Sequence, residues 1–243
     1  MMNLAMNTNS KLDFTPAEDI PYPSNFPPQE FYQGQSKITL DQLIGLRELV
    51  EHRSGEKKID QFIRENLTVL TAALRFATTG HHGAWVLSQQ MIRPKLAVSQ
   101  PGLIPDFIIG GKSSDGFDWW VVELKGADAK LFSRKKGYLY LSDTLNKGVC
   151  QLLTYIDYCD EVQATIRDQL RLTKFRRPNG LIIIGREDEL DGDEQKQKLK
   201  SAWNKINAPH LEVRTYDALL RTTEALYHGW KSLWSEFLSR DAG

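Results

Sequence analysis

Two carboxylates and a lysine lie in two short apolar segments that are close together in the chain. Asp106 belongs to the segment Pro105–Ile109, and Glu123 and Lys125 share the segment Val121–Lys125. Apolar strands seldom contain ionisable side chains unless these are paired or bind a metal ion. Carboxylates are hard oxygen ligands of the kind that Mg²⁺ binds together with waters and phosphate oxygens. These residue types point to metal-dependent hydrolysis of phosphodiester bonds.

The spacing of the three residues is compatible with a shared site. Residues two apart in a strand point to one face, so Glu123 and Lys125 share a face. A hairpin centred near residues 113 to 115 would bring Asp106 opposite residues 120 to 123. We expect Asp106 and Glu123 to bind the metal and Lys125 to orient water or stabilise negative charge. A plain salt bridge between Lys125 and one acid is the alternative.

The elements that would position these residues follow from hydrophobic periodicity. Strands are expected at 85–92, 103–109, 117–125, 180–185 and 211–215, with Gly110-Gly111 and Asp115-Gly116 supplying turns between the second and third. Helices are expected at 40–49, 59–70, 141–171, 189–205 and 217–238. This order predicts an α/β fold.

Composition limits the function classes. The 243 residues include 31 basic and 31 acidic side chains, so the net charge is zero. A protein that coats nucleic acid is normally more basic, although a local basic groove remains compatible with this balance. No apolar run approaches the roughly 20 residues of a membrane span, no secretion signal is visible, and Cys150 and Cys159 lie too far apart on one helix for a disulfide. We therefore expect a cytoplasmic protein.

The chain divides into three parts by pattern. Residues 1–36 contain five prolines between Pro16 and Pro28 and are expected to form an extended N-terminal arm, whose aromatic residues could pack on the body or on a partner. Residues 37–58 form a helical lead-in, and residues 59–243 form the main domain with a C-terminal helix. That helix carries Trp230, Leu233, Trp234 and Phe237 at helical spacing, which suits a core or an interface equally well.

The triplet resembles a known nuclease motif. Pro105-Asp106 followed by Glu123-x-Lys125 is similar to the PD-(D/E)xK motif, and Gln151 and Tyr155 resemble the Gln-x-x-x-Tyr signature on the helix after the catalytic strand. The resemblance implies a restriction-endonuclease-like core, a central mixed β-sheet flanked by helices. It also implies that Gln151 orients the site, that Tyr155 lies beside it, and that Glu65 is a possible fourth acid.

Residues 59–217 resemble more narrowly the nuclease domain of the Shedu antiphage defence proteins. The similarity includes the segments Phe62–Asn66, Trp119–Lys125, Gly180–Gly185 and Val213–Asp217. This family implies a Mg²⁺-dependent DNA endonuclease or nickase that acts against phage as a homo-oligomer, with Mn²⁺ as a possible substitute metal. No glycine-rich phosphate loop is present, so no nucleotide cofactor is expected.

A basic cluster follows the catalytic strand on an expected loop. Lys130, Arg134, Lys135 and Lys136 could contact the DNA backbone, and Tyr138 and Tyr140 could stack on splayed bases. Solvated charges and packed tyrosines are the alternative for these residues.

Two other functions are compatible with the same motifs. One is a restriction or repair nuclease of the same fold. The other, from a different class, is a module that binds DNA or a partner without cutting.

Overall fold

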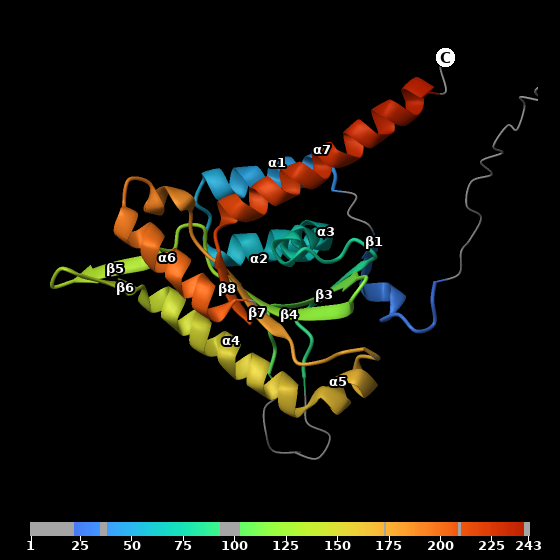
Figure 1. Cartoon of the computed structure of the whole chain (residues 1–243), viewed down its shortest axis with the longest axis horizontal. Helices are drawn as coiled ribbons and strands as arrows, with labels where there is room; N and C mark the ends of the chain where they lie inside the picture. The colour runs from blue at the N-terminus through green and yellow to red at the C-terminus, as the bar shows by residue number, and fades with distance from the viewer. Residues whose placement is uncertain (1–21, 35–37, 93–102, 173, 209, 241–243) are drawn as a thin grey trace, which may run out of the picture.

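The computed structural model describes residues 22–34, 38–92, 103–172, 174–208 and 210–240, with side chains described as far as residue 229. Its centre is a six-stranded mixed sheet in the order β1-β2-β3-β4-β7-β8. Neighbours from β1 to β4 are antiparallel, whereas β4, β7 and β8 run parallel. Helices cover both faces of this sheet (Figure 1). The predicted α/β class, with a mixed central sheet flanked by helices, is confirmed.

The strands and helices have the following bounds. The sheet contains β1 (Tyr32–Gly34), β2 (Ala84–Ser88), β3 (Phe107–Ser113), β4 (Gly116–Leu124), β7 (Asn179–Ile183) and β8 (Leu211–Arg214), and a separate hairpin contains β5 (Phe132–Lys135) and β6 (Tyr138–Leu141). The α-helices are α1 (Leu40–Glu51), α2 (Glu56–Glu65), α3 (Leu67–Leu70), α4 (Asp143–Glu161), α5 (Gln163–Gln169), α6 (Glu194–Asn207) and α7 (Tyr216–Arg240). Short 3₁₀ turns are η1 (Gln29–Phe31), η2 (Thr71–Ala77) and η3 (Glu187–Leu190).

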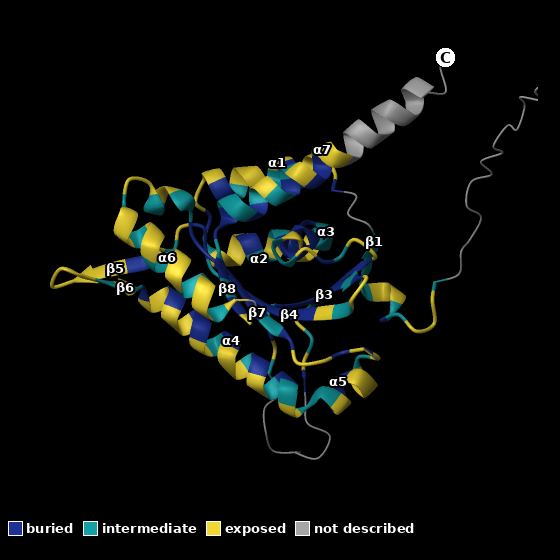
Figure 2. Cartoon of the chain, in the orientation of Figure 1, coloured by how far each residue is buried: buried dark blue, intermediate teal, exposed yellow. Residues whose placement is uncertain are grey.

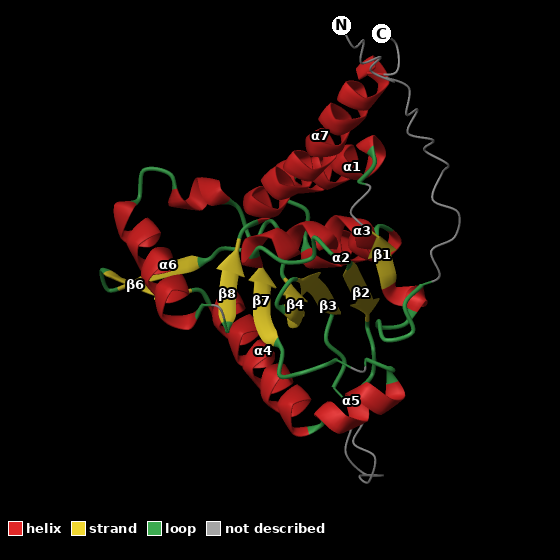
Figure 3. Cartoon of the chain, turned by 45° about the vertical axis from the view of Figure 1, so that its right-hand side comes forward, coloured by secondary structure: helices red, strands yellow, loops and turns green. Residues whose placement is uncertain are grey.

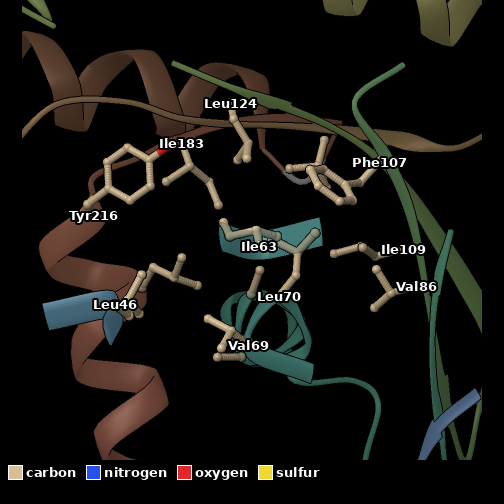
Figure 4. Close-up of a cluster of buried hydrophobic side chains, with 14 of the residues drawn as sticks. Leu46, Ile63, Val69, Leu70, Val86, Phe107, Ile109, Leu124, Ile183 and Tyr216 are labelled. Atoms are coloured by element: carbon tan, nitrogen blue, oxygen red, sulfur yellow. The ribbon is translucent and has the colours of Figure 1, made fainter. Parts of the chain in front are cut away.

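Two hydrophobic layers hold the sheet between its helices. Helices α1, α2, α3 and α7 cover one face and α4, α5 and α6 the other (Figures 1 and 3). Because side chains alternate along a strand, Val122 and Leu124 lie in the first layer, beneath α1, α2, α3 and α7. Val121 lies in the second layer, beneath α4, α5 and α6. The sheet is dark with buried residues in Figure 2, and Figure 4 shows the packing of the first layer around Ile63 and Leu70.

The β3–β4 hairpin turns within the predicted range of residues 113 to 115, although only one of the two predicted glycine segments lies at the turn. Phe107 pairs with Val122 and Ser113 with Gly116, so the turn lies at residues 114 and 115 and Gly116 has a φ of +119°. Gly110 and Gly111 are not turn residues, because both lie inside β3. A Cβ on Gly110 would come within 2.5 Å of the Trp119 ring, which explains a glycine at this strand position.

Several predicted bounds are wrong at their ends. The strand expected at 85–92 ends at Ser88, and the strand expected at 103–109 begins at Phe107. The helix expected at 59–70 is interrupted at Asn66, whose φ of −135° is not helical. The helix expected at 141–171 is likewise divided at Val162 into α4 and α5. Local backbone breaks of this kind leave little trace in hydrophobic periodicity.

The described part of the N-terminal arm packs on the body. Strand β1 pairs with β2 at the sheet edge. The rings of Phe26 and Tyr32 each lie 5.4 Å from Trp85, centroid to centroid, and the Trp85 Nε1 donates a 2.7 Å hydrogen bond to the Tyr22 hydroxyl. These residues bury Trp85 completely. The side chains of Trp230, Leu233, Trp234 and Phe237 lie outside the described residues.

Two further observations concern helices and cysteines. Among the described residues no helix has both the length and the apolar character needed to cross a membrane. Cys150 and Cys159 both lie in α4, and both are free thiols.

Candidate active site

The β3–β4 register places Asp106 opposite Glu123. Asp106 lies one residue before β3, where continuation of the Phe107–Val122 pairing would reach Glu123. The Leu124 amide donates a 2.9 Å hydrogen bond to Asp106 Oδ2, which fixes the carboxylate against the end of β4. Burial raises the pKa of Asp106 above its ordinary value, although this hydrogen bond and the charges of Lys125 and Arg64 oppose the rise.

Glu123 is a buried acid with one free oxygen. The residue is only 1% exposed. Its Oε1 accepts a 2.6 Å hydrogen bond from Lys125 Nζ, whereas its Oε2 has no hydrogen-bond partner among the described residues. Burial, together with the negative charge of Asp106, raises the pKa of Glu123 to about 7. The two acids therefore oppose each other's ionisation, and Glu123 Oε2 is a buried acceptor without a donor.

Lys125 lies between two acids from different elements. Besides Glu123, it contacts Glu56 Oε2 at 3.5 Å, and Glu56 is the first residue of α2. Burial alone would lower the pKa of Lys125, but the hydrogen bond and charge of Glu123, with the charges of Glu56 and Asp106, raise it. The side chain is therefore a cation. Sequence reasoning missed Glu56, because only the tertiary fold brings the start of α2 to the end of β4.

Helix α4 closes the same side of the site. A Cβ on Gly148 would lie 2.3 Å from Ile182 Cδ1 and 3.4 Å from Lys125 Cε, so this glycine lets α4 approach the Lys125 stem closely. Gln151 Nε2 donates to the Tyr155 hydroxyl at 2.9 Å, and that hydroxyl donates to the Ile104 carbonyl at 3.2 Å. Burial and then the charges of Glu123 and Asp106 raise the pKa of Tyr155. Gln151 and Tyr155 therefore link α4 to the segment that carries Asp106.

The backbone that follows Glu123 is fixed from three directions. The fully buried Tyr216 donates from its hydroxyl to the Lys125 carbonyl at 2.7 Å. The Gly185 amide donates to the Gly126 carbonyl at 3.0 Å, and the Ala127 amide donates to the Ser54 carbonyl at 2.9 Å. Sequence reasoning singled out the segments that contain Gly185 and Tyr216 but gave neither residue a role.

Glu65 is not joined to the other acids by any interaction of the described residues. It is exposed at the end of α2, where it accepts a 3.1 Å hydrogen bond from Gln61. Glu56 lies nine residues earlier, about 13 Å away along the helix, and it is Glu56 that meets Lys125. Asp60, between them, forms an ion pair with Arg64, and its other, buried oxygen has no hydrogen-bond partner in the described part of the chain.

Only part of the basic cluster lies on a loop, since Lys130 precedes β5 and Lys136 follows it. Arg134 and Lys135 belong to β5, and Lys136 begins the turn to β6. Arg134 is paired with Asp193 at 3.0 Å and with Gln195 at 2.9 Å, whereas Lys130, Lys135 and Lys136 are exposed. The loop prediction was wrong for Arg134 and Lys135, because they lie in a strand of only four residues.

The donor set suits a hard divalent cation. Asp106 and Glu123 share a face of the sheet, and Glu123 Oε2 is a buried acceptor that lacks a donor. No group of three or more acidic, histidine or cysteine ligands occurs among the described residues. Mg²⁺ commonly uses only one or two carboxylates and takes its other ligands from waters and substrate phosphates, so two acids suffice.

Comparison with known proteins places these residues within a known family. A family model described as Shedu protein SduA, C-terminal, matches residues 53–220. The matched region contains Asp106, Glu123, Lys125 and Gln151, together with Glu56 and Tyr216, the two contacts of Lys125 that sequence reasoning missed. No curated protein matches the chain.

Proposed function

The chain belongs to the Shedu protein SduA family, and from that premise we propose that it is a metal-dependent DNA endonuclease or nickase. The family is linked to antiphage defence. In this proposal Asp106 and Glu123 hold Mg²⁺, or Mn²⁺ in its place, and the substrate is a phosphodiester bond of DNA. A homo-oligomer, which the family resemblance implies, stays a prediction.

One observation carries the proposal. Glu123 is 1% exposed, yet no described residue donates to its Oε2, and its neighbour Asp106 is also an acid. A buried acceptor of this kind costs free energy unless a hydrogen-bond donor or a cation fills the place next to it. Lys125 occupies only Oε1. A cation between Glu123 and Asp106 would satisfy the remaining acceptor and offset the repulsion of the two acids.

Bound Mg²⁺ would lower the pKa of a coordinated water and offset the charge that builds up on the phosphate. The residues of the chain would do the rest. Lys125, a cation held by Glu123 and Glu56, would donate a hydrogen bond to a phosphate oxygen or to the attacking water. Gln151 and Tyr155 would hold the Asp106 segment in place through the Ile104 carbonyl.

The main rival is a module of the same fold that binds DNA without cutting it. In such a module the buried Glu123 would have no chemical role, and its replacement by an uncharged residue would leave function intact. No observation favours a restriction or repair nuclease over a defence nuclease.

The test is cleavage of supercoiled plasmid with and without Mg²⁺. We expect nicked or linear product only with the metal, and a loss of at least about 100-fold in Lys125→Ala, since this change removes charge stabilisation in the transition state. Lys205→Ala is the matched control, because that lysine is exposed on α6 and has no role in the candidate site. Binding of DNA without cleavage under any metal condition would refute the enzymatic proposal.

A further inference from the structure

The β5–β6 hairpin has one anchored face and one free face. Cross-strand partners point to the same side, and the pairs are Ser133 with Tyr140, Lys135 with Tyr138, Arg134 with Leu139, and Phe132 with Leu141. The faces therefore alternate along the ribbon. One face carries Phe132, Arg134, Leu139 and Leu141, and the other carries Ser133, Lys135, Tyr138 and Tyr140.

The anchored face is tied firmly to the body. Phe132 is buried, and Leu139 and Leu141 pack against the hydrophobic layer beneath α4. The carboxylate of Glu189 accepts hydrogen bonds from the Leu131 amide at 2.6 Å and the Phe132 amide at 3.1 Å. With the Arg134–Asp193 pair, these contacts fix the base of the hairpin only a few residues after Lys125.

The free face combines rings and positive charge. Tyr138 is 70% exposed and Tyr140 is 50% exposed, although tyrosines usually bury much of their ring. Lys135 and the turn residue Lys136 are exposed, and neither forms an ion pair with another residue in the described part of the chain. The hairpin projects from the body beside α6, and its outer half is coloured as exposed (Figures 1 and 2).

The geometry of the free face suits a strand of unpaired nucleotides. Tyr138 and Tyr140 are two residues apart in β6, so their side chains start about 7 Å apart. This spacing is about twice the 3.4 Å rise of stacked bases, and one base can therefore enter between the two rings. Aromatic rings bind bases only where the base faces are free, which favours single-stranded over duplex DNA.

We propose that the free face of the β5–β6 hairpin (Ser133, Lys135, Lys136, Tyr138 and Tyr140) binds single-stranded nucleic acid next to the candidate active site. The tyrosines stack on bases and the two lysines contact phosphates. The inference rests on the proposed function for its choice of substrate. It goes beyond that function because it assigns a preference for single-stranded over duplex nucleic acid to a defined surface. It also leaves Arg134, which lies on the anchored face, out of the contact.

The test is binding of a fluorescent single-stranded oligonucleotide and of its duplex by the full chain in EDTA, which prevents metal-dependent cleavage. We expect Tyr138→Ala/Tyr140→Ala to weaken single-strand binding roughly tenfold or more, with a much smaller effect on the duplex. Tyr138→Phe/Tyr140→Phe, which keeps both rings, should bind like wild type. Ile206→Ala, which shortens an exposed side chain on α6, is the control for loss of surface apolar area.

The lysines give a second readout. Lys135→Ala/Lys136→Ala should reduce the slope of log affinity against log salt by about 1.4 for single strands. Lys198→Ala/Lys205→Ala removes the same charge from α6 and should leave the slope unchanged.

The binding test can fail or succeed independently of the plasmid cleavage test. Unchanged single-strand binding in the double tyrosine variant, or equal loss in that variant and in Ile206→Ala, overturns the hairpin assignment even if the plasmid is cut. Selective loss of single-strand binding supports it even if no cleavage is found.

Discussion

Glu123 governs how the candidate site responds to pH. Its pKa is raised to about 7 by burial and by Asp106, whereas an ordinary glutamate has a pKa of 4.5. Because the folded pKa is the higher one, the folded protein binds more protons than the unfolded chain between these values. The metal-free protein therefore loses stability as pH rises through this window.

Metal binding should accordingly release a proton. A cation on Glu123 requires the carboxylate, so Mg²⁺ affinity should rise with pH up to about pH 7, and the number of protons released per bound metal ion should lie between zero and one at pH 7. Calorimetry in buffers of different ionisation enthalpy measures this number. Glu123→Gln should abolish the linkage. Mg²⁺ binding with no proton release, or with the same release in the variant, would contradict the assignment.

Tyr216 acts on Lys125 through the backbone. The Tyr216→Phe change removes the hydroxyl that donates to the Lys125 carbonyl and leaves a buried acceptor unpaired, at a cost of about 1–3 kcal/mol in the free energy of unfolding. Denaturant unfolding measures that cost. If the contact positions Lys125, kcat should fall while DNA affinity in EDTA stays unchanged, and equal loss of both would indicate general damage to the fold.

At the scale of elements, the close contact between the end of β7 and the segment after β4 holds the site together. Gly185 has a φ of +61°, and a Cβ there would lie 2.5 Å from the Ala129 carbonyl oxygen. We expect Gly185→Ala to destabilise the protein by about 2–4 kcal/mol, because backbone strain and a clash add together.

Gly192→Ala is the matched control for that measurement. Gly192 also has a positive φ, +71°, but a Cβ there would meet nothing within 4 Å. Its cost should be about 1–2 kcal/mol from backbone strain alone. Equal melting temperatures of the two variants would argue against the close approach.

Sequence patterns predicted the elements better than they predicted the contacts between them. The pairing of Asp106 with Glu123 could be foreseen, since strand alternation and the turn at Asp115-Gly116 both restrict the register. Glu56 could not be foreseen, because no local pattern reports which helix end meets Lys125. The β5–β6 hairpin was missed for a different reason. Its two strands are only four residues long, which is too short for a clear alternation, although Lys136-Gly137 forms a two-residue turn between them.

At the scale of the whole molecule, the described arm residues complete the sheet edge. Trp85 is fully buried beneath Tyr22, Phe26 and Tyr32, so Tyr22→Ala/Phe26→Ala should expose it. The expected results are a loss of about 2–4 kcal/mol in unfolding free energy and a red shift of tryptophan fluorescence. Tyr22→Phe keeps the ring and should cost only about 1 kcal/mol. Unchanged stability and fluorescence in the double variant would contradict this packing.

The central claim is that Glu123 is a metal-binding acid of a nuclease and that Glu65 is not part of its site. Plasmid cleavage in Mg²⁺ by Glu123→Gln and Glu65→Gln, each an isosteric change of one carboxylate, tests it directly. We predict a fall of at least about 100-fold in the rate for Glu123→Gln and a change within about twofold for Glu65→Gln. A Glu123→Gln protein that cuts at the wild-type rate would contradict the account.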